Sequence, residues 1–204
     1  MLIRRLTQLY AGLTAFGLAM ALNIRSGLGL NPWDVFHQGM AQWTGLSFGT
    51  VVIAVGVAVF LAWIPLRQKP GLGTVSNIIV IGLAVDLFLA VLPPFQSWPV
   101  RIAALASGIV LCGLATAAYI GAGFGPGPRD GLMTGLAKRT GWSIRLVRTG
   151  IEIVVLAAGW ALGGTAGIGT VLFAVAIGPL VQAFLPFFDV AGNRPPPAGR
   201  RKLA

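Results

Sequence analysis

The chain has 204 residues, of which 56% are hydrophobic and 10% are charged. Soluble domains carry about 25% charged residues, so this chain cannot cover a water-facing surface, and a soluble globular protein is excluded. Continuous apolar runs of about 18 or more residues instead predict an all-α polytopic membrane protein that lies in a lipid bilayer. In such a protein the net charge of +10 indicates basic cytoplasmic loops, and we expect no nucleic-acid partner.

Six apolar stretches are long enough to be transmembrane helices. In chain order they are Leu6–Ile24, Phe48–Leu66, Thr74–Leu92, Ile102–Ala122, Thr149–Ala166 and Ile168–Phe188. If the N-terminus is cytoplasmic and all six stretches span, Arg25 and Arg101 are the two basic residues outside, and the other 13 of the 15 lie inside. Basic residues accumulate in loops that stay cytoplasmic, so both termini are predicted to be cytoplasmic. Residues 189–204 combine prolines with basic residues and predict a disordered basic cytoplasmic tail.

The sequence repeats itself at an offset of 96 residues. Gly27–Asp34 aligns with Gly123–Asp130, and Gly71–Val75 aligns with Gly167–Val171. Without a gap, residues 9–92 share 29 identities in 84 positions with their counterparts, whereas composition alone gives roughly a tenth. Each repeat holds three spans, an odd number, so the second is inserted upside down. The sequence therefore predicts an inverted-topology 3+3 repeat, with the first unit at residues 1–96 and the second at 97–188.

A short segment that is too polar to span follows the first span of each repeat. Asn31-Pro32-Trp33-Asp34 offers a capping residue, a proline at the first helical position and an acid in the first turn. Gly127-Pro128-Arg129-Asp130 repeats the pattern with a weaker cap. The helices that follow, to about Thr44 and Thr140, are about half a bilayer long. They either lie on the membrane surface as amphipathic helices or re-enter the membrane, so that their positive ends face a central site.

Polar residues at membrane depth are the candidates for a substrate path. A carboxylate inside a span costs about 2.5–3.5 kcal/mol on insertion scales, so Asp86 is expected to face the bundle interior or a cavity. Its repeat counterpart is Gln182. The predicted path residues are Asp86, Gln182, Asn31, Asp34, Arg129, Asp130 and Asn77. Arg148 and Glu152 have the spacing of a structural ion pair, and His37 lies on the same helix face as Asp34.

The sequence contains no set of residues typical of catalysis. It has one His and one Cys, no Walker motif and no Ser-His-acid combination with a credible base. We therefore expect neither an enzyme nor a cofactor or metal site.

The motifs Gly-Leu-Gly-Leu-Asn-Pro-Trp-Asp, Gly-Leu-Gly-Thr and Gly-Pro-Gly-Pro-Arg-Asp-Gly resemble those of the YczE-type bacterial membrane proteins, relatives of the YitT group. The resemblance reaches to about residue 188 and implies a multi-pass protein of the bacterial plasma membrane. That family supplies no molecular activity and no site residues.

The sequence is best interpreted as a small permease for an unknown small molecule, with its site between the repeats near mid-membrane. Two alternatives stay open: a substrate-capturing membrane subunit of a multi-component vitamin importer, and a membrane regulator or assembly partner that does not transport. A homo-oligomer is compatible with each.

Overall fold

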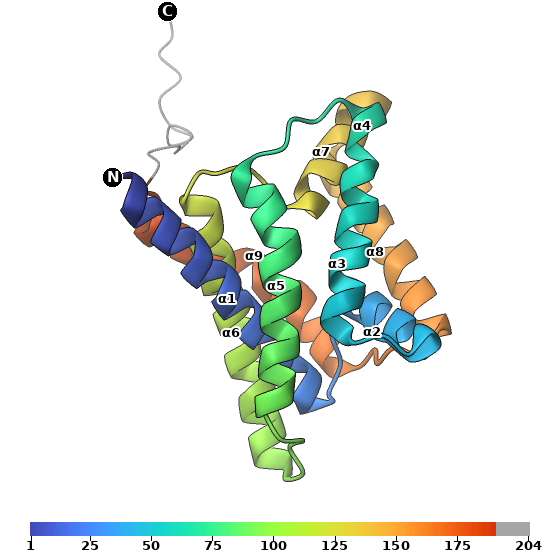
Figure 1. Ribbon diagram of the computed structural model, residues 1–204. Coiled ribbons are helices and arrows are strands. Elements are labelled where there is room, and N and C mark those ends of the chain that lie inside the picture. Colours follow the sequence, from blue (N-terminus) through green and yellow to red (C-terminus); the bar gives the residue numbers. More distant parts are fainter. Residues whose placement is uncertain (191–204) are drawn as a thin grey trace, which may run out of the picture.

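The computed structural model describes residues 1–190, and all regular secondary structure within them is helical (Figure 1). In chain order the helices are α1 (Leu2–Ser26), α2 (Pro32–Thr44), α3 (Phe48–Leu61), α4 (Trp63–Leu66), α5 (Leu72–Val91), α6 (Trp98–Gly121), α7 (Pro128–Thr140), α8 (Ile144–Ala161) and α9 (Ile168–Phe188). Of the predicted tail, residues 191–204 lie outside the described residues.

Each of the six predicted apolar stretches forms a helix over most of its length, although α8 ends at Ala161, five residues before the predicted end at Ala166. Four of them, namely α3 with α4, α5, α6 and α9, are long and apolar enough to cross a membrane by length and composition. The other two, α1 and α8, carry more polar side chains, such as Gln8 and Arg148. The stretch at Phe48–Leu66 divides at Ala62 into α3 and α4. The helix predicted to start at Thr149 begins earlier, at Ile144, because the Ser143 side chain accepts a hydrogen bond from the backbone of Leu146 and caps it.

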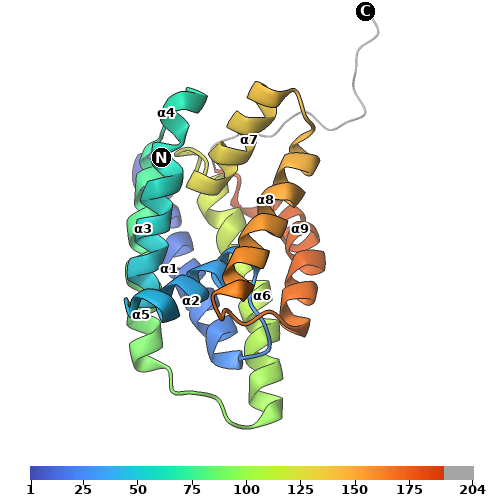
Figure 2. The ribbon, with the colours of Figure 1, turned by 90° about the vertical axis from the view of Figure 1, so that its right-hand side faces the viewer.

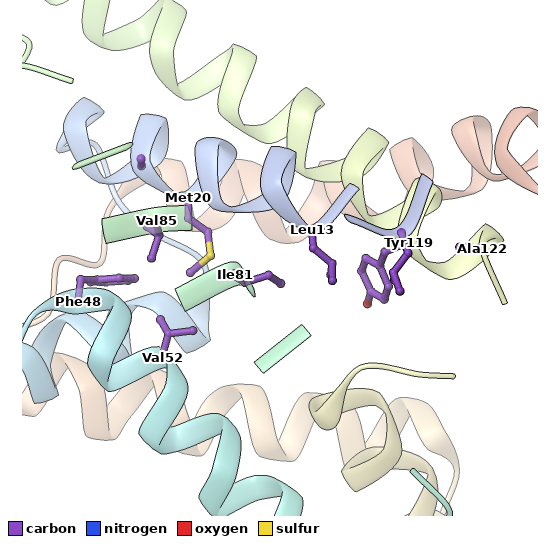
Figure 3. Packing of buried hydrophobic residues seen from close by; sticks show 10 residues of the cluster. Leu13, Met20, Phe48, Val52, Ile81, Val85, Tyr119 and Ala122 are labelled. Atoms are coloured by element: carbon purple, nitrogen blue, oxygen red, sulfur yellow. The ribbon is translucent and has the colours of Figure 1, made fainter. Parts of the chain in front are cut away.

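The core lies along α1, which packs against both α5 and α6. Helix α5 also contacts α3, and α6 also contacts α9. Figure 3 shows the apolar side chains that fill the space between α1, α5 and α3. The buried cluster consists of Leu9, Leu13, Met20, Ala21, Phe48, Val52, Ile81, Val85, Tyr119 and Ala122. Helices α3, α5, α6 and α9 are therefore linked to α1 directly or through a neighbour, whereas α8 packs against α2 and α7.

The two short helices begin and end where the sequence predicts. Asn31 caps α2, since its side chain accepts a hydrogen bond of 3.0 Å from the backbone N–H of Asp34. Both helices have 13 residues, and each ends at a glycine with positive φ, 71° at Gly45 and 74° at Gly141. Figure 2 shows α2 and α7 at different levels of the bundle, with α7 near the end that carries α4. The N-terminal ends of α2 and α7 therefore both lie toward the middle of the helix bundle.

Contacts at equivalent positions recur in the two halves. Arg5 donates from Nε to the carbonyl oxygen of Ala122 (2.8 Å), and 96 residues later Arg101 donates from Nε to that of Ser26 (2.6 Å). Each arginine thus bonds a carbonyl that follows or ends the first helix of the other half, where backbone carbonyls lack partners within the helix.

The glycine pairs that open α5 and α9 also make equivalent contacts. Gly73 donates its backbone N–H to Phe124 (2.9 Å), and Gly169 donates to Leu28 (2.8 Å). A Cβ at Gly71 would lie 2.1 Å from the Phe124 oxygen, so only glycine permits this approach. The segment that leads into each short helix is therefore held by the other half of the chain.

Candidate functional site

A cavity of about 340 Å³ lies inside the bundle, where the two short helices begin. Residues of α1, α2, α3, α5, α6, α7, α8 and α9 line it. Its walls are mainly apolar, with polar groups gathered around Asn31 at the start of α2 and Gly127 at the start of α7. An apolar cavity with a few convergent polar groups is the usual form of a small-molecule site.

The α2 end of the cavity carries a buried polar cluster. Asp34 and His37 are each 1% exposed, and His37 Nδ1 lies 3.3 Å from Asp34 Oδ1. The Asn31 amide donates to Asp34 Oδ2. The Asp34 carboxylate is therefore engaged through both of its oxygens by residues of its own helix.

The α7 end presents charges that are less fully engaged. Asp130 is exposed to the cavity and accepts a hydrogen bond of 3.2 Å from the Tyr119 hydroxyl. The Arg129 guanidinium lies 4.8 Å from the centre of the Trp33 ring, a favourable cation–π arrangement. Within residues 1–190 no group accepts a hydrogen bond from Arg129, and the buried indole N–H of Trp33 has no acceptor either. The cavity thus contains donors that its own walls do not use.

The structure brings most of the predicted path residues together. Five of them line the cavity: Asn31, Asn77, Arg129, Asp130 and Gln182. Asp34 lies behind Asn31, to which it is hydrogen-bonded. The predicted ion pair between Arg148 and Glu152 is present at 2.8 Å and lies at the cavity wall.

Asp86 is the exception, because it does not line the cavity. Its Oδ1 accepts a hydrogen bond of 2.7 Å from the backbone N–H of Gly49, and its Oδ2 accepts one from the Ser47 hydroxyl. These groups lie at the N-terminus of α3, where backbone N–H groups lack partners within the helix. The carboxylate therefore joins α5 to the first turn of α3.

The equivalent junction in the second half is not formed. A Cβ at Gly82 on α5 would lie 2.7 Å from the carbonyl oxygen of Gly49, whereas at Gly178 on α9 nothing lies within 4 Å. Gln182, the counterpart of Asp86, is exposed and has no hydrogen-bond partner among the described residues. Helix α3 is thus latched to α5 at its start, while α8 and α9 are separated at the matching place. Gly178 and Gln182 both line the cavity on this side.

Sequence reasoning missed two groups of the site. Tyr119, which binds Asp130, was not predicted because its repeat counterpart is Asn23, and nothing local marks it. Trp33 was not predicted as a site residue, although it is 7% exposed and its ring lies against Arg129. The alignment of Trp33 with Arg129 at the repeat offset was the available signal.

Comparison with known proteins places the chain in a family. The family described as "Family of unknown function (DUF6198)" matches residues 3–186, and the chain belongs to it. An uncharacterized protein of Haemophilus influenzae is 43% identical over 173 residues, which cover 85% of this chain and 79% of that protein. The uncharacterized membrane protein YczE of Bacillus subtilis is 36% identical over 188 residues, 91% of this chain and 87% of that protein. The uncharacterized protein YyaS of Bacillus subtilis is 30% identical over 185 residues, 87% of this chain and 90% of that protein. No solved structure matches the chain.

Proposed function

We propose that this member of a membrane-protein family is a permease of the bacterial plasma membrane, which carries a small molecule through the cavity between its two halves. The proposal includes six spans (α1, α3 with α4, α5, α6, α8 and α9), arranged as two inverted three-helix repeats with both termini in the cytoplasm. The recurrence at offset 96 of the arginine contacts and of the glycine contacts supports the repeat. The bias of basic residues supports the orientation.

We further propose that α2 and α7 re-enter the membrane from opposite sides. The charge bias assigns the start of α2 to the outer side and the start of α7 to the inner side. Nevertheless Arg129 of α7 lies 4.8 Å from the ring of Trp33 of α2. Two helices on opposite surfaces would be separated by about 30 Å of hydrocarbon. The contact therefore favours re-entrant helices whose first turns meet near mid-membrane.

One observation carries the transport proposal: a junction that is formed in one half is open at the equivalent place in the other. Asp86 latches α3 to α5, but Gln182 on α9 makes no such contact with α8. In an inverted repeat these two junctions lie at opposite membrane faces, so the cavity is closed toward one face and open toward the other. Exchange of the two junctions would move the opening across the membrane, which is alternating access. A regulator without transport would have no need of the second state.

The test is whether the open junction also closes. Ser143 and Gln182 are the counterparts of Ser47 and Asp86, so a cysteine pair at 143 and 182 probes the open junction and a pair at 47 and 86 is the matched reference. Both are made in a Cys112→Ala background and oxidised in native membranes, because a disulfide requires Cα atoms within about 7 Å. We expect the reference pair to form readily and the 143/182 pair to form as well, more slowly.

Formation of the reference pair alone, over the full time course, would contradict alternating access and favour the regulator. Copurification of the chain with an ATPase module would instead favour the importer subunit.

A further inference from the structure

The cavity holds two charges of opposite sign that are not paired with each other. Arg129 and Asp130 are neighbours in the first turn of α7, and both line the cavity. The ion pairs within residues 1–190 join Arg148 to Glu152 and His37 to Asp34, and neither involves Arg129 or Asp130. Arg129 lies against the Trp33 ring and is attracted by the carboxylates of Asp34 and Asp130 without forming an ion pair with either, while Asp130 accepts a hydrogen bond from the Tyr119 hydroxyl.

Unpaired charges at membrane depth are expensive to keep, and those in known proteins usually serve a substrate or an ion. Adjacent residues of a helix do not face each other, so Arg129 and Asp130 cannot readily satisfy one another, and within residues 1–190 no other residue forms an ion pair with either. Arg129 lies against the Trp33 ring and Asp130 binds the Tyr119 hydroxyl. A ligand with one positive and one negative group could bind Arg129 and Asp130 at the same time. A simple anion would leave Asp130 without a partner, and a simple cation would leave Arg129 without one.

We infer that the substrate of the proposed permease is an α-amino acid with an apolar side chain, whose carboxylate binds Arg129 and whose ammonium group binds Asp130. The inference rests on the proposed function and assigns its substrate class. Guanidinium groups bind carboxylates through parallel charge-assisted hydrogen bonds, and the positive N-terminal end of α7 favours the same group. The buried indole N–H of Trp33 is a further donor beside Arg129.

The rest of the cavity fits the side chain of such a substrate. Its walls near α7 are apolar, with Val55 and Val59 from α3, Met133 from α7 and Ile177 from α9. A volume of about 340 Å³ is at the small end of ligand sites and suits a solute of amino-acid size. The second acid at this depth, Asp34, is already engaged by Asn31 and His37 and does not compete for the ammonium group.

The binding test uses the standard amino acids as probes, with purified full-length protein in detergent and equilibrium dialysis. Each apolar amino acid is compared with two analogues of similar shape that each lack one charge. For leucine these are 4-methylpentanoate and 3-methylbutylamine. We expect at least one apolar amino acid to bind, and to bind about tenfold or more tightly than either analogue.

Two variants separate the roles of the charges. Arg129→Gln should weaken the amino acid and the carboxylate by about tenfold or more and leave the amine unchanged, and Asp130→Asn should weaken the amino acid and the amine and leave the carboxylate unchanged. Arg139→Gln is the matched control, because Arg139 lies outside this cavity. Opposite changes toward the two analogues cannot arise from a general loss of folding.

The substrate assignment is overturned if no apolar amino acid binds, if either analogue binds as tightly as its amino acid, or if both variants bind like the wild type. Its failure is distinct from failure of the transport proposal. Amino-acid binding with this charge dependence but without a 143/182 disulfide would retain the site and reject the permease. Formation of the 143/182 disulfide without amino-acid binding would support the permease and reject the substrate assignment.

Discussion

Replacement of Asp86 by Asn tests whether this carboxylate is a latch between α3 and α5. The wild-type carboxylate accepts one hydrogen bond from the Gly49 N–H (2.7 Å) and one from the Ser47 hydroxyl. Asn keeps the shape and one acceptor oxygen, so it loses one of these bonds, the negative charge, and its attraction to the positive N-terminal end of α3. The sequence alone assigned Asp86 to the substrate path; the observed contacts predict instead that this substitution changes stability and access.

The expected cost follows from those lost interactions. A hydrogen bond to a charged group contributes about 1.5–3 kcal/mol, but the Ser47 side is exposed to solvent, which reduces its share. A loss of about 1–2 kcal/mol is therefore expected, or a decrease of about 2–8 °C in melting temperature for a chain of this size. Thermal unfolding in detergent measures it. Gln182→Asn, at the equivalent position of the second half, is the matched control, since Gln182 has no hydrogen bond among the described residues to lose.

The Asp86→Asn variant should also expose the cavity to the outer face, because its latch is weakened. A cysteine at Val55, which lines the cavity, should react faster with an external membrane-impermeant maleimide in Asp86→Asn than in the Cys112→Ala background alone. Unchanged melting temperature and unchanged labelling would refute the latch. Loss of amino-acid binding at unchanged stability would return Asp86 to the substrate path.

Three further predictions test the fold. Gly167→Ala should destabilise the protein by about 1–3 kcal/mol, because its Cβ would lie 2.6 Å from the carbonyl oxygen of Leu28. Gly178→Ala should cause no such loss, because nothing lies within 4 Å of a Cβ at that position. Thermal unfolding compares the two variants. Arg101→Gln should lower the melting temperature by loosening the end of α1, and Arg101→Lys should restore only part of it, since Lys cannot reproduce the two-pronged contact with two carbonyls. Single cysteines placed in residues 134–141, at the end of α7 that does not line the cavity, should not react with an external impermeant maleimide, and reaction there would contradict the inverted repeat.

Local signals predicted the short helices well and the interruption between α3 and α4 poorly. Both ends of α2 were predictable, because Asn31 and Pro32 at its start and Gly45 at its end determine the backbone within one helical turn of their own positions. The break at Ala62 was not predicted, because the apolar run continues through it. Pro65 was the only local sign, since a proline inside a helix removes one backbone hydrogen bond.

The site was predictable where residue depth decided the outcome and not where a distant partner did. Arg129, Asp130 and Gln182 were proposed from their positions in the repeat, and all three line the cavity. Asp86 was assigned to the same path by the same argument, yet its partner Ser47 is 39 residues away and no sequence pattern joins the two. Depth in the membrane indicates that a carboxylate needs a partner but does not say which one.

In the proposed permease, the residues that differ between the two halves decide which conformation is favoured. The latch of the first half is the carboxylate of Asp86, and its counterpart in the second half is the neutral amide of Gln182. The second half also has Arg145 on α8 at the position that matches Gly49. A hydrogen bond to a charged acceptor is roughly twice as strong as one to a neutral acceptor. In addition, Gly49 allows α3 to approach α5 closely at Gly82, and Arg145 is too large to allow the same approach between α8 and α9. The junction with Asp86 is therefore the more stable of the two, so the conformation that is closed at Asp86 and open at Gln182 should be the favoured one in the absence of substrate. For the proposed permease, transport then requires that substrate binding between Arg129 and Asp130 offset this difference, since a ligand shifts two conformations only by its difference in affinity for them. That requirement places the charges that bind the substrate on α7, which contacts both α3 and α8, the helices that the two junctions hold or release.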